Sequence, residues 1–175
     1  MVYIFLANGF EDVEAIQPRD LLLRAGIKVT TVGVGAKTVK SAFGLTVTAD
    51  ITEDELNLAD ADAVVFPGGM PGAANLAASP TVKNAIAFAL EHNRVIGAIC
   101  AAPGVVLANT GALSEKNYTC FPGFEVSEGN YTAAKVERDG NLVTGNGPAA
   151  AAEFTAVVAG AISPKAEDLI RKMYK

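Results

Sequence analysis

The chain has 175 residues, of which 50% are apolar and 19% are charged, and its net charge is −5. This length and apolar content are typical of a single domain, here residues 1–175, that buries a core without disulfides or metals. Because nucleic acids and anionic membranes bind basic surfaces, the acidic balance argues against both classes of partner.

Short apolar runs alternate along the chain with longer helical patterns. The first run, residues 2–7, is continuously apolar, as in a strand that is buried on both faces. Ser79 and Pro80 are typical of an N-cap and a first helical residue, and Asp139 and Gly140 of a hairpin turn. In chain order, we predict strands at residues 2–7, 28–34, 46–48 (in a hairpin beside the sheet), 63–66, 94–99, 118–121, 135–138 and 141–144, and helices at 11–25, 79–92, 101–109, 147–162 and from 164 onward.

The sequence also predicts the compartment. The N-terminal apolar run is short, lacks a basic lead-in and is followed by acidic residues at positions 11, 12 and 14, unlike a secretory signal. No stretch approaches the roughly 18 uninterrupted apolar residues of a membrane span. The two cysteines, Cys100 and Cys120, are too few for a disulfide framework. We therefore expect a soluble, cytoplasmic protein.

The alternation of strands and helices predicts an α/β fold with a mainly parallel sheet and helices on both faces. In such sheets, reactive groups lie beyond the carboxyl ends of the strands. Three segments fall there: the loop after Ala7, the glycine-rich loop after Phe66, and Cys100. We expect the functional site where these segments meet.

Cys100 is the candidate reactive centre. It follows the predicted strand at 94–99 and precedes small residues that begin a helix, an arrangement that holds a reactive side chain out at a sharp turn. A helix N-terminus lowers the pKa of a cysteine and so favours the nucleophilic thiolate. The alternative is a small buried hydrophobe, the commonest role of a free cysteine. The local pattern favours neither reading over the other.

Glu14 is the candidate partner of that cysteine. It follows the first predicted strand, and the apolar residues Val13 and Ile16 flank it on the predicted helix. A carboxyl buried there would have a raised pKa, and it could hydrogen-bond a cysteine sulfur or act as an acid or base. The alternative is a solvated acidic first turn stabilised by the helix dipole, which suits Glu11 and Asp12 better than Glu14.

The loop at residues 67–72 contains three glycines, so no side chain obstructs their backbone N–H groups. Beside Cys100, the amides of Gly69 and Ala101 could form an oxyanion hole. The alternative is a glycine turn that geometry alone requires. The glycine spacing matches neither a dinucleotide-binding fingerprint nor a P-loop, so we expect no nucleotide cofactor.

We expect His92 and Cys120 to take no part in the reaction, although both side chains are chemically reactive. His92, the only histidine, ends a predicted helix at the edge of the sheet opposite Cys100, where a polar residue complements the helix terminus. One histidine and scattered carboxylates make a zinc site unexpected. Cys120 is expected to be an inert buried thiol, with a redox role as the alternative.

Four segments resemble the motifs of the ThiJ/PfpI family, whose best-known member is the Parkinson-associated deglycase, within the class I glutamine amidotransferase-like superfamily. They are residues 9–14 (GFEDVE), 66–69 (FPGG), 97–103 (GAICAAP) and 144–148 (TGNGP), in the family's order. The resemblance implies a flavodoxin-like three-layer sandwich that works as a homodimer. It implies Cys100 as the nucleophile and Glu14 as its hydrogen-bonding carboxyl. It also implies Gly68, Gly69 and Ala101 as oxyanion- or substrate-binding residues.

Members of this family include cofactor-free glyoxalases, protein deglycases, peptidases, and oxidative-stress sensors or chaperones. The peptidase branch has a histidine where Ala101 follows Cys100, and other members have one where Phe121 precedes Pro122. A Cys–His pair is therefore unsupported, and peptide or amide hydrolysis is a remote reading. We expect cofactor-independent processing of a small aldehyde or dicarbonyl, or of its adducts. The alternative is a stress sensor in which Glu14 stabilises a Cys100 sulfinate.

Overall fold

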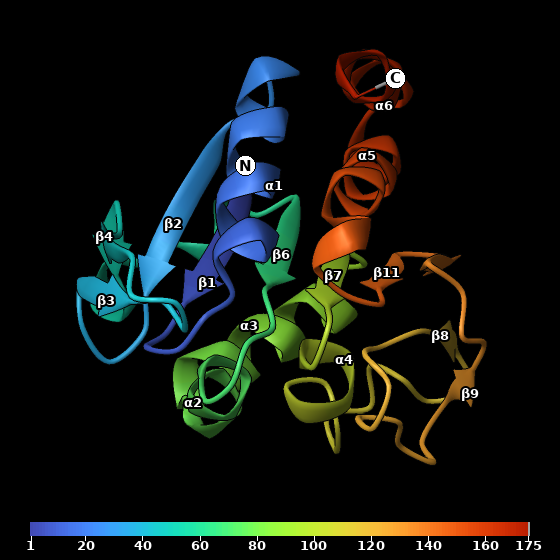
Figure 1. The fold of residues 1–175 in the computed structure, drawn as a ribbon, viewed down its shortest axis with the longest axis horizontal. Helices are drawn as coiled ribbons and strands as arrows, with labels where there is room; N and C mark the ends of the chain where they lie inside the picture. The colour runs from blue at the N-terminus through green and yellow to red at the C-terminus, as the bar shows by residue number, and fades with distance from the viewer. Residues whose placement is uncertain (175) are drawn as a thin grey trace.

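The computed structural model describes residues 1–174, and a seven-stranded sheet forms its centre (Figure 1). The strand order is β10-β11-β7-β6-β1-β2-β5, and every neighbouring pair is parallel except β10 and β11. The strands are β1 Val2–Leu6, β2 Val29–Gly33, β5 Ile51–Thr52, β6 Ala63–Phe66, β7 Val95–Ile99, β10 Val136–Asp139 and β11 Leu142–Gly145. The predicted α/β class and mainly parallel sheet are confirmed.

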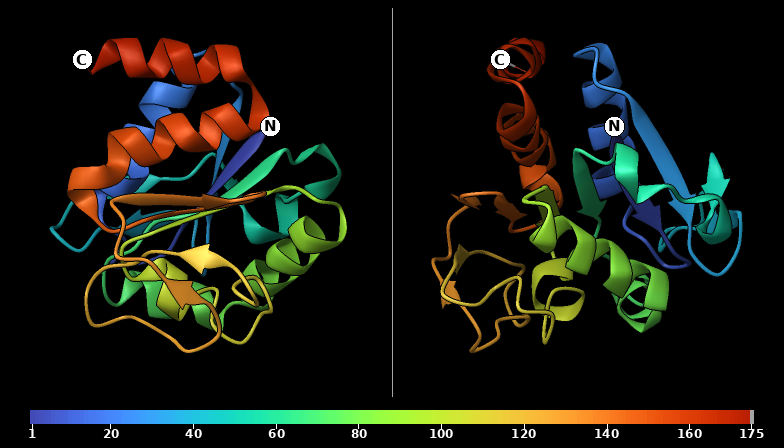
Figure 2. Two further views of the ribbon diagram at one scale, coloured as in Figure 1. Left: turned by 90° about the vertical axis from the view of Figure 1, so that its right-hand side faces the viewer. Right: turned by 180° about the vertical axis from the view of Figure 1, so that it is seen from behind.

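Helices cover both faces of this sheet (Figure 2). One face packs against α1 Asp12–Arg24, α5 Ala151–Ile162 and α6 Pro164–Met173, and the other against α2 Gly72–Ala78, α3 Pro80–Glu91 and α4 Ala102–Val105. Side chains alternate along β1, so that Val2 and Ile4 enter the first layer while Tyr3 and Phe5 enter the second. A strand buried on both faces must be apolar throughout, which explains the continuous apolar run at the N-terminus.

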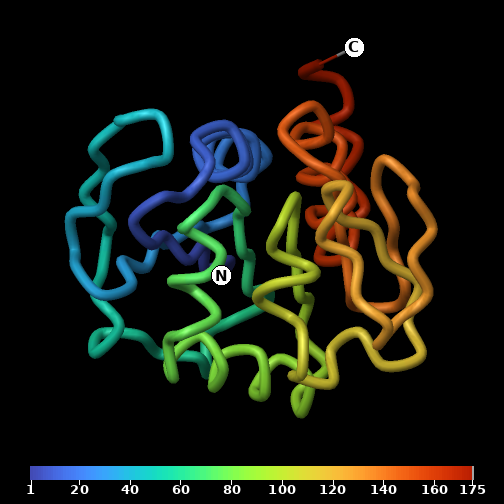
Figure 3. Tube along the Cα trace, turned by 60° about the horizontal axis from the view of Figure 1, so that its bottom comes forward, coloured from blue at the N-terminus to red at the C-terminus, as the bar shows by residue number. Residues whose placement is uncertain are grey.

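Two small sheets lie apart from the central one, on opposite sides of the molecule (Figure 3). One is the predicted hairpin, β3 Thr38–Lys40 with β4 Thr46–Thr48, and the other pairs β8 Asn117–Tyr118 with β9 Asn130–Tyr131. Short 3-10 helices complete the fold at Glu53–Glu55, Leu58–Asp60 and Pro148–Ala150. The last of these begins the helix predicted at 147–162, which continues as α5.

Two predicted elements were wrong in extent, and helix α2 and the two-residue strands β5 and β9 were not predicted. The helix expected at 101–109 ends early, because the Leu107 N–H donates to the Ala102 carbonyl, five residues back, and the helical pattern stops there. The strand expected at 118–121 is the shorter β8, because the Phe121 N–H donates to Cys100 instead of continuing a ladder. The loop was expected at 67–72, and helix α2 was not predicted after it, since the helix begins with a glycine after a proline.

Within residues 1–174, no helix combines the length and the apolar character that crossing a bilayer requires. The same residues contain no group of three or more histidine, cysteine or acidic side chains arranged to hold a metal ion.

Candidate active site

Cys100 lies at the carboxyl end of β7, at the turn into α4. Its φ of 64° is in the left-handed region, which residues other than glycine rarely adopt. Two backbone hydrogen bonds fix this conformation: the Cys100 N–H donates to the Gly145 carbonyl, and the Cys100 carbonyl accepts from the Phe121 N–H, both at 2.8 Å. The side chain is partly exposed. A strained backbone held from both sides is typical of functional sites, so the predicted sharp turn is present.

Glu14 is completely buried, although it is charged when ionised and lies in the first turn of α1. Its Oε2 accepts a hydrogen bond of 2.8 Å from the Gly68 N–H. Its Oε1 is buried and has no conventional hydrogen-bond partner among the described residues. The Glu14 backbone is fixed by Glu11, the N-cap of α1, whose carboxylate accepts from the Glu14 N–H at 2.8 Å. The solvated alternative therefore fails for Glu14.

Gly68 brings Cys100 and Glu14 together. A Cβ at this position would lie 2.6 Å from the Cys100 Cβ, 2.8 Å from the Glu14 Oε2 and 3.0 Å from the Ala101 nitrogen. Only glycine fits so close an approach without displacing its neighbours. The strand order explains the meeting, because β6 lies between β7 and β1, and all three strands are parallel. Their carboxyl ends therefore open at one edge of the sheet.

The ionisation of the pair is set by burial. Burial raises the pKa of Glu14 from 4.5 to about 7, and the charge of Glu11 adds to this rise. The hydrogen bonds with the Gly68 N–H and the Cys100 thiol lower the pKa but do not cancel the effect of burial. Burial, followed by the negative charge of Glu14, raises the pKa of Cys100 from 9.0 to about 12. The amides of Gly69 and Ala101 oppose this shift, because they face the sulfur and lower the thiol pKa.

This arrangement can move a proton within the site. At neutral pH the thiol of Cys100 keeps its proton, while the carboxyl of Glu14 is close to half protonated. A base with a pKa near the working pH suits proton transfer from a neighbouring thiol. The Gly69 and Ala101 amides face the sulfur, a position from which amides could stabilise negative charge.

The chain has two further residues of interest for chemistry, His92 and Cys120. His92 caps the C-terminus of α3, stacks on Phe88 with ring centroids 4.0 Å apart, and precedes β7, so it lies at the opposite end of that strand from Cys100. Cys120 is completely buried, and burial, followed by the charge of Glu125, raises the pKa of its thiol to about 11. His92 is therefore remote from Cys100, whereas Cys120 directly precedes Phe121, whose N–H donates to the Cys100 carbonyl. That neither side chain takes part stays a prediction.

Three residues that contribute to the site, Met70, Phe121 and Gly145, were not predicted from the sequence. The Gly145 carbonyl and the Phe121 N–H hold the cysteine through the backbone, and backbone groups carry no residue-specific signal. Next to site residues, the side chains of Met70 and Phe121 are 49% and 44% exposed. Exposed apolar side chains beside a reactive group are a signal for substrate contact that only the structure provides.

The chain is similar to known proteins over most of its length. The model of the DJ-1/PfpI family matches residues 1–160. The Parkinson disease protein 7 homolog of Danio rerio is 35% identical over 162 residues, which cover 89% of this chain and 85% of the relative. A Caenorhabditis elegans protein named glutathione-independent glyoxalase DJR-1.2 is 31% identical over 147 residues, which cover 82% and 78% of the two chains.

A solved structure agrees with these sequence matches. The crystal structure of a mutant DJ-1 superfamily protein from Salmonella typhimurium superposes with a TM-score of 0.91 at 34% identity. The superposition covers 98% of this chain and 94% of that protein. Sequence and fold therefore lead to one conclusion: the chain belongs to the DJ-1/PfpI family.

Proposed function

We propose that this protein converts small 2-oxoaldehydes, such as methylglyoxal, or their adducts, with Cys100 as the nucleophile and without a cofactor. The observation that carries the proposal is the pair of a partly exposed cysteine and a completely buried carboxyl whose pKa is raised to about 7. The name of the Caenorhabditis elegans relative, a glutathione-independent glyoxalase, supports this class of reaction.

The proposed reaction needs no external oxidant. Glu14 takes the thiol proton as the Cys100 sulfur bonds to the aldehyde carbon, and the Gly69 and Ala101 amides stabilise the oxyanion. Glu14 returns the proton to that oxygen, which gives a hemithioacetal. It then removes the hydrogen from the former aldehyde carbon as a proton, which gives an enediol, and delivers a proton to the neighbouring carbon. The hydroxyl proton moves from the first oxygen to the former ketone oxygen, which becomes the 2-hydroxyl group. The resulting thioester reacts with water to release the 2-hydroxy acid and restore the thiol, so the substrate is oxidised at one carbon and reduced at the next.

Purified protein is expected to form lactate from methylglyoxal in the absence of glutathione. Cys100→Ser is expected to abolish the product, whereas the matched variant Cys120→Ser retains it. Glu14→Gln is expected to lower turnover by roughly a hundredfold or more, because it removes the base, while iodoacetamide still alkylates Cys100. Lactate formation is followed enzymatically, and wild-type protein that forms none would contradict the glyoxalase proposal.

A second candidate function is the sensing of oxidants, and the position of His92 favours it. The only histidine lies at the far end of β7, so no imidazole assists turnover at Cys100. Peroxide would oxidise the Cys100 sulfur to a sulfenate with release of water, and a second peroxide would give the sulfinate. A protonated Glu14 could donate a hydrogen bond to either product.

Mild peroxide treatment is expected to add oxygen to Cys100 and to spare Cys120, which is completely buried. Intact mass and peptide mapping identify the oxidised residue. Oxidation confined to Cys120 would remove the support for a sensor.

We also propose that the protein is a homodimer and that a second copy covers an apolar surface on α1 and the β3–β4 loop. This surface consists of Val13, Ile16, Phe43 and Leu45, of which Phe43 is 83% exposed. A hollow of about 500 Å³ lies between the helix and Leu45. Exposed apolar patches of this kind mark protein interfaces. A two-fold dimer would place the same patch of both copies in contact.

Ile16→Glu is expected to convert the dimer to a monomer in analytical ultracentrifugation, because it introduces a charge into the apolar surface. Leu90→Glu, at another exposed apolar position, on α3, is the matched control and should leave the dimer intact. A wild-type monomer at micromolar concentration would refute this interface.

A further inference from the structure

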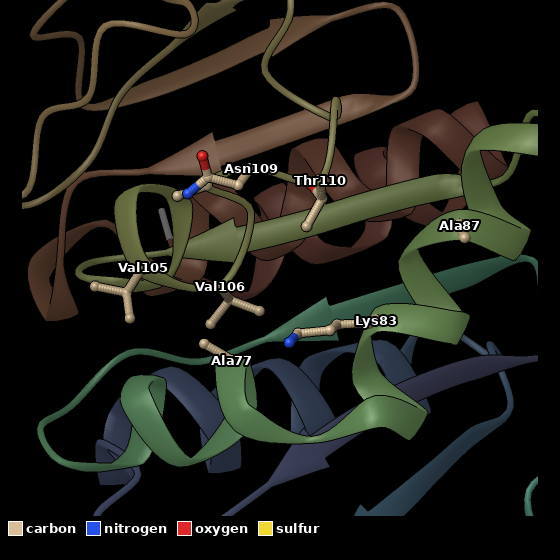
Figure 4. Close-up of a pocket in the computed structure, with 8 residues that line it drawn as sticks. Ala77, Lys83, Ala87, Val105, Val106, Asn109 and Thr110 are labelled. Atoms are coloured by element: carbon tan, nitrogen blue, oxygen red, sulfur yellow. The ribbon is translucent and has the colours of Figure 1, made fainter.

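A cavity separate from the cysteine site lies between α2, α3 and the chain that follows α4 (Figure 4). Its volume is about 460 Å³, within the range of small-molecule pockets, roughly 300–1,000 Å³. It is lined by Ala77, Lys83, Ala87, Val105, Val106, Ala108, Asn109 and Thr110. Five of these residues are alanine or valine and form an apolar wall, and Lys83, Asn109 and Thr110 form a polar rim of similar extent.

Lys83 is the charged residue of this lining. Its side chain extends from α3 toward Ala77 and Val106 (Figure 4). No acidic side chain among residues 1–174 forms a salt bridge with it. Lys83 is exposed, so its ammonium group is open to a dissolved anion that also contacts the apolar wall.

Asn109 and Thr110 form the polar rim of the cavity beside Lys83. The Asn109 side chain makes no hydrogen bond to any described residue, so its amide can bind a ligand. The Thr110 hydroxyl is already engaged, because it donates to the Leu107 carbonyl and accepts from the Ala112 N–H at 3.3 Å. Glu128 is the acidic group at this rim, and both of its carboxylate oxygens accept from the Asn109 N–H at 2.8 and 2.9 Å. Its charge is therefore partly compensated on the rim.

We propose that this cavity is a binding site for a small carboxylate with a short apolar chain. The carboxylate would pair with the Lys83 ammonium and accept from the Asn109 amide. The chain would lie against Ala77, Ala87 and Val106. The proposal does not depend on turnover at Cys100.

The cavity shares two structural elements with the reactive cysteine. Helix α2 follows the loop that contains Gly69, and α4 follows Ala101 directly. These two residues supply the amides that face the Cys100 sulfur. A ligand held between α2 and the chain after α4 would therefore act on the separation of the two amides. Occupancy should change the reactivity of Cys100.

Titration of the protein with hexanoate at pH 7 tests the site. Two readouts are measured during the titration: the backbone amide NMR shifts and the rate at which iodoacetamide alkylates Cys100. We expect a Kd on the order of 1 mM, as for a ligand of this size, and shifts centred on the lining residues. The alkylation rate should change about threefold or more at saturation. Hexan-1-ol and hexylammonium, which lack the negative charge, should bind at least about tenfold more weakly.

Substitutions at Lys83 and Ala87 test separately the contribution of the positive charge and that of the open volume of the cavity. Lys83→Gln should weaken hexanoate binding about tenfold, and Lys165→Gln, on α6 at the other face of the sheet, should not. Ala87→Leu should fill the cavity and block binding, whereas Ala87→Ser should preserve it. Binding that is equal in Lys83→Gln and wild type, or absent at 20-fold the expected Kd (roughly 20 mM), would overturn the site. Binding with an unchanged alkylation rate would overturn its link to Cys100.

Discussion

Replacing Glu14 with glutamine is expected to remove a pH dependence of stability that amounts to roughly 3 kcal/mol between pH 4.5 and about 7. In the folded protein, burial holds the pKa of Glu14 at about 7, whereas its ordinary value is 4.5. Between these values, the folded state keeps a proton that the unfolded state has released. The free energy of unfolding therefore falls as the pH rises. The stabilisation is complete below pH 4.5 and is lost as the pH passes about 7.

Glutamine is neutral at every pH, and its carbonyl oxygen can still accept from the Gly68 N–H. Urea unfolding at pH 5, 6, 7 and 8 should therefore give a falling free energy for wild type and a flat profile for Glu14→Gln. At pH 8 the variant should be the more stable protein. Glu91→Gln, at an exposed position that ends α3, should follow wild type. Parallel profiles for all three proteins would show that Glu14 is ionised in the native state throughout this range.

Other titrating groups act outside this window. The hydrogen bond from the Asn117 N–H, at 3.0 Å, lowers the pKa of Asp139 from 3.8. The stability that Asp139 contributes is lost as the pH falls below 3.8, so its pH dependence has the opposite sign to that of Glu14. The thiol of Cys100, with a pKa raised from 9.0 to about 12, reduces stability only above pH 9. The interval from pH 4.5 to 8 therefore separates Glu14 from both.

Strand and helix positions could largely be predicted, because the pattern of apolar residues in the sequence follows which side chains of an element are buried. A strand covered on both faces must be apolar throughout, as residues 2–7 and 63–66 are. The predicted location of Cys100 was also correct, because strand ends and small residues are visible in the sequence. The two errors in extent fell between residues 101 and 121, where the backbone bonds to distant groups such as the Thr144 hydroxyl, which accepts from the Thr119 N–H at 2.9 Å.

The environment of the site could be predicted only in part. A carboxyl in the first turn of a helix is usually solvated, so the sequence left the burial of Glu14 open. Burial depends on which strands are neighbours, and here β6 carries the 67–72 loop over α1. The cavity beside Lys83 lies between the consecutive helices α2 and α3 and the chain after α4, about 20 residues further along. No local pattern encodes such a space.

Gly68→Ala is expected to lower turnover roughly a hundredfold, because a displacement of about 1 Å at reacting groups has an effect of this size. The added Cβ would lie 2.6 Å from the Cys100 Cβ and 2.8 Å from the Glu14 Oε2. Cys100 cannot retreat easily, since hydrogen bonds to Gly145 and Phe121 hold its backbone on both sides. The pair must therefore separate, and Glu14 weakens or loses its bond to the Gly68 N–H.

Overpacking also lowers stability, by about 1–3 kcal/mol, so the test needs a variant that is destabilised without a change at the site. Gly97→Ala meets this need. It lies within β7, and its Cβ would meet Phe154 at 3.1 Å and Val158 at 3.3 Å, in the core behind the strand. At a temperature where both variants are folded by circular dichroism, Gly97→Ala should keep near wild-type lactate formation and Cys100 alkylation. Gly68→Ala should lose lactate formation and show a changed rate of Cys100 alkylation. Equal losses in the two variants would mean that stability, and not the approach of Cys100 to Glu14, sets the activity.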